Sequence, residues 1–212
     1  MSQTEGPKTM NTARSRSGSP NGMSTPLRIE NTALHLFREK GYAGSSIREI
    51  AAGSDVAIAT MFHHFPSKLA ILERLLHLAV DELQAELDEA MKDTTDARER
   101  LRACVRVMVV AHCLRSTQSF VAESELRSLP EDASHDIRRK RLRIQKLFHK
   151  AVEEGIESGE FTCTDAKIAS VAILTMCTSV ASWYRPGGPL TPEQLAQFYV
   201  DFAFSIVHSS QG

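Results

Sequence analysis

Apolar residues recur every three or four positions from about residue 25 almost to the end of the chain. This spacing places them on one face of an α-helix, and no segment shows the alternation that is typical of a half-buried strand. The pattern predicts an all-α fold with nine helices, at about 25–40, 46–52, 57–63, 67–91, 97–114, 117–128, 132–157, 165–184 and from 192 onward. We therefore expect a head of three helices followed by a bundle of six.

Short signals mark where several of these helices begin and end. Ser46-Ile-Arg-Glu49 has the spacing of a capping box, in which a serine and a glutamate satisfy free amides at a helix start. Gly41 stands where a helix commonly ends, and Asp55 is of a residue type that tolerates a left-handed turn. These signals predict tight turns between the first three helices.

The first 24 residues differ in composition from the rest of the chain. They are rich in Ser, Thr, Gly, Asn and Pro and show no hydrophobic periodicity. Such a segment cannot bury enough apolar surface to fold. We expect a disordered arm at 1–24, a three-helix domain at 25–68 and a second, larger domain at 69–212.

The overall composition is that of an ordinary globular protein, with 42% hydrophobic and 24% charged residues. No apolar run approaches the length of a membrane span, and the first residues lack the apolar core of a secretory signal. Since no span is predicted, we expect no membrane contact. The four cysteines lack the paired spacing of a zinc site, and we expect no metal, no cofactor and a reducing cytoplasmic location.

Charge is distributed unevenly although the formal net charge is only −1. Residues 1–68 contain eight Lys and Arg against five Asp and Glu, which leaves +3 there and −4 in the remainder. A positive head on a negative body is typical of a small anion-binding domain. A chance partition of charge explains the same numbers equally well.

Two short helices joined by a tight turn, at about 46–52 and 57–63, form a helix-turn-helix candidate. The residues around them make this signal specific. They are Ala33-Leu-His-Leu-Phe37, Lys40-Gly-Tyr42, Ser46-Ile-Arg-Glu-Ile-Ala51 and Thr60-Met-Phe-His-His-Phe-Pro-Ser-Lys68. Over about residues 25–80 this pattern resembles the N-terminal domain of the TetR family of transcriptional regulators, and the helical remainder resembles that family's ligand-binding and dimerisation domain.

The resemblance implies a two-fold dimer that places one recognition helix per subunit in the major groove of a palindromic double-stranded DNA operator. Carried over by position, the residues that face the bases or the nearby backbone are Ala57, Ile58, Ala59, Thr60 and His63. Those that hold phosphates are Ser46, Arg48 and Lys68. The chemistry agrees, because helix starts attract anions, threonine contacts base edges and isoleucine packs on thymine methyl groups.

The chain departs from the family pattern at three positions. Asp55 replaces a usual glycine, Ala57 replaces a Ser or Thr cap, and Phe62 replaces a tyrosine whose hydroxyl could reach a phosphate. The apolar residues 57–59 favour readout through methyl groups and phosphates, although packing inside the head is an alternative role for them. The pair at 63–64 suggests a metal only weakly, since adjacent helical residues face different ways.

A second resemblance concerns the effector. Residues 125–130, 153–161 and 183–191 are similar to the branch that contains regulators of fatty-acid and sterol catabolism, several of which respond to acyl-CoA thioesters. It implies a repressor released by an acyl-CoA or similar hydrophobic effector; a repressor of an efflux system that senses lipophilic drugs is the alternative. The residues expected to line the effector site are Met108, Ala111, Phe120, Arg143, Phe148 and Cys177.

Five bases lie within residues 138–143, and they form either a solvated face or the contact for an anionic effector. The two C-terminal helices are so apolar that a monomer would expose a large patch, so they are expected to pair with their two-fold mates. The predicted interface residues are Val171, Trp183, Leu195, Phe198, Phe202 and Ile206. No Ser/His/Asp set, glycine-rich phosphate loop or Glu-x-x-His pair points to an enzyme, and a scaffold protein would not need the 46–68 pattern.

Overall fold

The computed structural model describes residues 23–208, so the predicted arm at 1–24 lies almost entirely outside the described residues. Between residues 23 and 208 the chain forms nine α-helices, one short 3-10 helix and no strand, which confirms the all-α prediction. The helices are α1 (Thr25–Gly44), α2 (Ile47–Gly53), α3 (Ile58–His64), α4 (Lys68–Met91), α5 (Ala97–Leu114), α6 (Ser116–Ser124), η1 (Leu126–Ser128), α7 (Glu131–Glu157), α8 (Ala166–Trp183) and α9 (Pro192–Val207).

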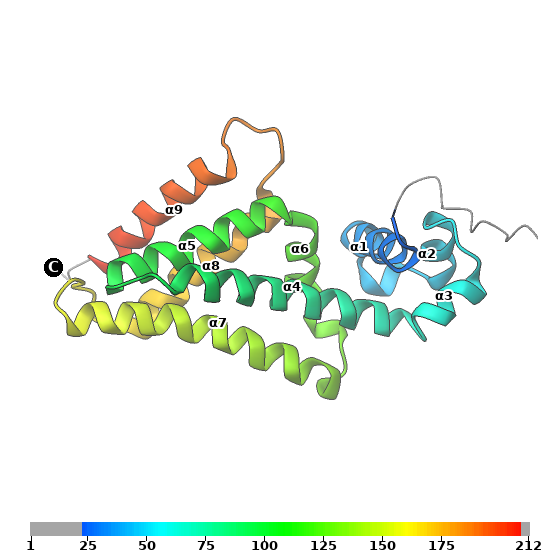
Figure 1. The fold of residues 1–212 in the computed structure, drawn as a ribbon, viewed down its shortest axis with the longest axis horizontal. Helices are drawn as coiled ribbons and strands as arrows, with labels where there is room; N and C mark the ends of the chain where they lie inside the picture. The colour runs from blue at the N-terminus through cyan, green and yellow to red at the C-terminus, as the bar shows by residue number, and fades with distance from the viewer. Residues whose placement is uncertain (1–22, 209–212) are drawn as a thin grey trace, which may run out of the picture.

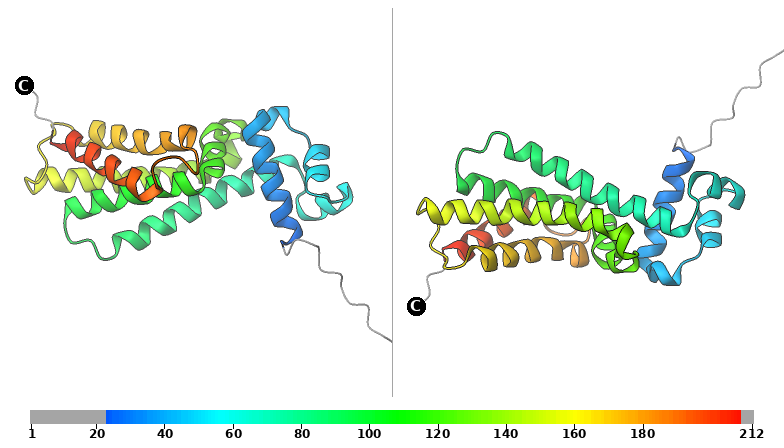
Figure 2. Two further views of the ribbon diagram at one scale, coloured as in Figure 1. Left: turned by 90° about the horizontal axis from the view of Figure 1, so that it is seen from above. Right: turned by 90° about the horizontal axis from the view of Figure 1, so that it is seen from below.

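The molecule is elongated, with α1–α3 gathered at one end and α5–α9 forming the rest of the body (Figure 1). Helix α4 runs without interruption from the head into the bundle, so the boundary expected at 68/69 falls at the start of a helix that serves both parts. Helix α5 lies inside the bundle and packs against α4, α7, α8 and α9, which surround it in the two views of Figure 2.

Most helix ends follow the local signals. The Ser46 hydroxyl accepts from the Glu49 amide while the Glu49 carboxylate accepts from the Ser46 amide, which confirms the capping box. Gly41 adopts φ +72° and interrupts α1 before a short final turn to Gly44. The helix expected at 117–128 instead ends at Ser124, because Glu125 leaves the helical region (φ −101°, ψ 1°) and a 3-10 turn precedes the extended backbone before Pro130.

Head and bundle share one continuous core. Ile29, Phe37, Ile50 and Met61 are buried in the head. Leu72 on the first turns of α4 is equally buried, and α4 packs against α1. The head is therefore seated on a helix whose far end belongs to the bundle.

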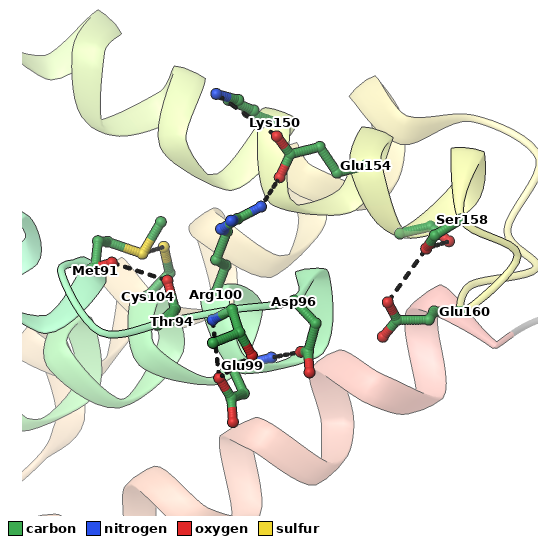
Figure 3. A network of polar contacts seen from close by, with 12 residues as sticks. Met91, Thr94, Asp96, Glu99, Arg100, Cys104, Lys150, Glu154, Ser158 and Glu160 are labelled. Atoms are coloured by element: carbon green, nitrogen blue, oxygen red, sulfur yellow. Dashed lines mark hydrogen bonds and ion pairs between the residues drawn. The ribbon is translucent and has the colours of Figure 1, made fainter.

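At the end of the bundle remote from the head, polar contacts join the helices (Figure 3). Arg100 of α5 forms an ion pair with Glu154 of α7, and both side chains are partly exposed. The Asp96 carboxylate caps the first turn of α5 by accepting from the Glu99 amide at 2.7 Å. The ion pair holds α5 and α7 together at this end, and the cap stabilises the start of α5.

Helix α8 corrects one expectation from the sequence. It is long and apolar enough to cross a membrane by length and composition, with a mean hydropathy of 1.3 over 18 residues, although no such segment was expected. The apolar residues are broken by serines and threonines, which hid the segment in a search for uninterrupted runs. One side of α8 packs against α5 and α7, which explains part of its apolar content.

Candidate DNA-binding head and effector cavity

Helices α2 and α3 are joined by a tight turn in which Asp55 adopts the left-handed conformation expected for it, with φ 52°. The Arg28 side chain of α1 secures this turn. Its Nε donates to the Ser54 carbonyl at 3.0 Å, and its Nη2 donates to the carbonyls of Ser54 and Asp55 at 2.5 and 2.6 Å. A guanidinium on carbonyls at the C-terminal end of α2 also matches the helix dipole. Arg28 therefore sets the position of α3 relative to α1.

Helix α3 presents most of its surface to solvent, because Met61 is its one buried residue. All five positions that the resemblance assigns to the bases are exposed: Ala57, Ile58, Ala59, Thr60 and His63. Ile58 keeps 44% of its surface exposed, so residues 57–59 do not serve the alternative role of packing the head. Ala57 provides no side-chain cap to α3, as the departure from the family pattern implies.

The start of α2 lies beside an exposed ion pair between Lys40 and Glu49. Ser46 and Arg48 are both exposed there, as a phosphate contact requires. Lys40 donates to the Glu49 carboxylate at 2.6 Å. Hydrogen bonds from Lys40 and then from Ser46 lower the pKa of Glu49 to about 2, so this carboxylate stays ionised. Lys40 neutralises Glu49, so the negative charge of Glu49 does not dominate the electrostatic potential at the start of α2.

Lys68 has a structural role that the sequence did not indicate. Its ammonium group donates to the carbonyls of Tyr42 and Ser45 at 2.6 and 2.7 Å and lies 4.2 Å from the centre of the Tyr42 ring. It thus ties the α1–α2 loop to the start of α4. A phosphate contact by Lys68 stays a prediction and would use the remaining N–H group.

A half-open cavity of about 80 Å³ lies in the bundle, where residues of α4, α5, α6, α7 and α8 line it. Its wall is mainly aliphatic, with polar groups from α5, α6, α7 and α8. The lining residues are Leu76, Ala79, Val80, Leu83, Met108, His112, Ser119, Ala122, Glu123, Ile137, Arg141, Ile144, Leu174 and Thr178. An apolar wall with a few polar groups is typical of sites for small hydrophobic ligands.

Of the six effector residues predicted from the sequence, Met108 alone lines this cavity. Phe148 and Cys177 are fully buried in the core, and Ala111 lies at a shallow surface groove with Leu114 and Arg115. Phe120 packs under the Arg38 guanidinium, 4.7 Å from its ring centre. Arg143 is exposed on the outer face of α7. The expected lining therefore does not coincide with this cavity at these five positions, because the rotation of each helix about its axis follows from packing.

Arg141 belongs to the basic stretch at 138–143 that the sequence offered as a contact for an anionic effector. The other polar residues of the cavity were not predicted; they are His112, Ser119, Glu123 and Thr178. His112 follows Met108 by four positions, so helical spacing alone could have found it. Glu123 belongs to the short helix α6, whose face the sequence did not settle.

Arg141 and Glu123 form an ion pair across the cavity wall. The Arg141 Nη2 lies 2.5 Å from a Glu123 carboxylate oxygen, and Nη1 donates to the Ala122 carbonyl at 3.3 Å. The nearby His112 is buried, and its Nδ1 lies 2.7 Å from the Met108 carbonyl. Burial lowers the pKa of His112, and the hydrogen bond to Met108 opposes this only in part. The cavity therefore offers one fixed cation, already matched by one carboxylate.

Helix α6 connects this cavity wall to the head. Its first residue, Ser116, accepts a hydrogen bond from Arg38 of α1 at 3.1 Å. Arg38 also covers the Phe120 ring. One end of α6 is thus held by the head and the other by Arg141.

Several large apolar side chains of α8 and α9 are exposed. They include Val171, Trp183, Phe198 and Phe202, and Phe202 keeps 53% of its surface exposed. Leu195 is corrected as an interface residue, because only 4% of it is exposed and it packs inward. Ile206 is half-buried. The predicted interface residues of α9, from 195 to 206, therefore lie partly in the interior and partly on the outer face.

Two protein-family models match the chain. The model described as bacterial regulatory proteins, tetR family, matches residues 29–75, and the model described as tetracyclin repressor-like, C-terminal domain, matches residues 94–207. The HTH-type transcriptional repressor KstR2 of Mycobacterium tuberculosis is 31% identical over 173 residues, which are 79% of this chain and 85% of that protein.

Solved structures agree with these matches. The structure of the ketosteroid transcriptional regulator KstR2 of Mycobacterium tuberculosis has a TM-score of 0.82 and 26% identity, and covers 91% of this chain and 98% of its own. The structure of AibR in complex with isovaleryl coenzyme A and operator DNA has a TM-score of 0.77 and 25% identity. It covers 85% of this chain and 98% of its own.

Proposed function

The chain belongs to the TetR family of bacterial regulatory proteins, and on that premise we propose that it is a ligand-responsive transcriptional repressor. Its relatives are DNA-binding regulators and not enzymes. We infer that it binds a palindromic double-stranded DNA operator as a homodimer in the cytoplasm. The observation that carries the proposal is the exposed face of α3, held in place by Arg28. The four free cysteines suit a reducing compartment.

In this proposal α3 enters the major groove. Thr60 and His63 contact base edges, and the side chains of residues 57–59 pack on thymine methyl groups. Ser46, Arg48 and Lys68 bind phosphates beside the groove, which fixes the register of the head without reading sequence.

Substitution of Lys68 by alanine is expected to weaken binding to every DNA sequence alike and to reduce the slope of log K against log salt by about one. Thr60→Ala is expected instead to change which operators are preferred. Operators are selected from random DNA with the unchanged protein, and affinities are measured by fluorescence anisotropy at several salt concentrations. Lys92→Ala, at the far end of α4, is the matched control. An unchanged salt slope for Lys68→Ala contradicts its phosphate contact.

For the effector we propose an acyl-CoA thioester or a similar hydrophobic compound. The aliphatic wall of the cavity suits an acyl group. The solved relative AibR is in complex with isovaleryl coenzyme A, and KstR2 is named as a ketosteroid regulator. Release of DNA would be a population shift, in which the ligand prefers a dimer whose recognition helices are spaced wrongly for successive major grooves. A tenfold release needs about 1.4 kcal/mol of such preference.

A titration of the operator complex with acyl-CoAs, free fatty acids and cationic dyes, followed by gel shift, tests this proposal. Acyl-CoAs are expected to release the operator, because their apolar part fits the wall between α4 and α8. Release by cationic dyes alone would instead favour a sensor of lipophilic drugs that controls efflux. Absence of release by all three classes contradicts the proposed effector.

A further inference from the structure

We propose that the effector presents an acyl oxygen at one end of an apolar body, and that this oxygen replaces Glu123 as the acceptor for the Arg141 guanidinium. Glu123 would then be a built-in competitor of the effector. The inference rests on the proposed function only in taking the cavity between α4 and α8 as the effector site.

The size of the cavity requires that some part of its wall moves. It measures about 80 Å³, whereas sites for small ligands generally measure roughly 300–1,000 Å³. Most lining residues are aliphatic side chains that also belong to the core of the bundle, such as Val80 and Ile137. Displacing them into water is unfavourable. The wall must therefore open where its side chains are already hydrated.

Glu123 meets that condition. Its side chain is 39% exposed, so it can turn outward and become fully hydrated without leaving a buried, unpaired charge. Helix α6, which carries it, has nine residues and a single buried one, Val121. This is the least firmly packed part of the wall.

Arg141 is positioned to remain after Glu123 leaves. It belongs to α7, a helix of 27 residues, and its Nη1 keeps the hydrogen bond to the Ala122 carbonyl. A guanidinium is a planar fork of donors that matches a carboxylate or another acyl oxygen. When Glu123 turns away, the Arg141 guanidinium lacks an acceptor, and the oxygen of an acyl compound supplies one.

The charges around Arg141 select against the opposite exchange, in which a cationic ligand pairs with Glu123. Arg139 and Lys140 are paired with Asp136 and Asp81. Arg138 and Arg143 have no carboxylate partner among residues 23–208. Displacing Arg141 from Glu123 would leave a further unmatched cation on this basic stretch of α7. An acceptor oxygen lowers the electrostatic energy there, and a cation raises it.

The exchange also reaches the DNA-binding head. Glu123 lies at the C-terminal end of α6, and Arg38 of the head donates to Ser116 at the other end. After Glu123 is released, the end of α6 near the cavity is held by Arg141 only through the 3.3 Å hydrogen bond to the Ala122 carbonyl, while Arg38 still holds the end near the head.

Calorimetry on the full-length protein without DNA tests the head-group assignment. Four ligands share a ten-carbon chain: decanoyl-CoA, decanoate, decan-1-ol and decylammonium. We expect at least one of the two acyl compounds to bind about tenfold more tightly than the alcohol, as one charge-assisted hydrogen bond predicts. Tight binding of decanoate identifies a free acid as the source of the acyl oxygen, and tight binding of decanoyl-CoA identifies a thioester.

Two substitutions should change this affinity in opposite directions. Arg141→Gln is expected to remove the advantage of the acyl compound over the alcohol, and Arg141→Lys to retain part of it. Glu123→Gln is expected to increase acyl affinity several-fold, because the amide competes less well for Arg141. Arg139→Gln and Glu86→Gln, which alter exposed ion pairs outside the cavity, are the matched controls. Thermal melts without ligand report whether each variant is folded.

Three results would overturn the inference: preference for the alcohol or the ammonium compound, no binding of either acyl compound, or equal losses of affinity in the Arg141 and Glu123 variants. The last result would indicate a merely structural ion pair. Operator affinity is measured separately on the same samples. If acyl compounds bind as expected but the protein does not bind an operator, or does not release it on ligand binding, the proposed function alone is contradicted.

Discussion

Replacing Phe202 with glutamate is expected to convert the protein from a dimer to a monomer and to weaken operator binding about a thousandfold, because each monomer reaches one half-site. Phe202 is one of the exposed apolar side chains of α8 and α9, and 53% of its surface is accessible. At a two-fold interface each substitution acts twice, and an unpaired carboxylate buried between apolar helices is strongly unfavourable.

The monomer itself should remain folded, because Phe202 points away from the core of its own chain. Sedimentation velocity at micromolar concentration measures the association state, and circular dichroism measures folding. Leu142→Glu is the matched control, since Leu142 is a similarly exposed apolar residue on α7. A Phe202→Glu protein that sediments as a dimer would show that this face is not the interface.

Replacing Arg28 with methionine is expected to weaken operator binding about 10- to 100-fold, corresponding to roughly 1.5–3 kcal/mol for hydrogen bonds to a charged group. Arg28 joins α1 to the carbonyls of Ser54 and Asp55 in the turn that precedes α3. Without these bonds the turn loses its fixed position, and binding must order the recognition helix again.

Hydrogen exchange distinguishes this positioning role from a direct contact with DNA. In the free protein, the amides of residues 54–56 should exchange faster in Arg28→Met than in the unchanged protein, while the amides of α5 should not change. Arg28→Lys, which keeps the charge but loses the fork of donors, should restore binding only in part. Unchanged exchange at the turn together with weak operator binding would contradict the positioning role.

Most of the head could be predicted from the sequence because its signals are local. The Ser46–Glu49 capping box and the left-handed turn at Asp55 each depend on residues within a few positions of one another. The exposure of residues 57–60 agrees with what the resemblance to the TetR family implied, whereas the residues themselves had left packing inside the head open. The role of Lys68 could not be predicted, because its partners Tyr42 and Ser45 lie more than twenty positions away.

In the bundle, the residue pattern was sufficient to predict which segments are helices and that they are strongly apolar, because helical spacing and caps act over three or four residues. Which side of each helix faces the cavity depends on the packing between helices and could not be predicted. Arg141 lines it while Arg143, two residues later, faces solvent, and Leu195 is buried while Phe198 is exposed. A helix that is apolar on several sides can be rotated without changing its own pattern, and the neighbouring helices that pack against it select one orientation.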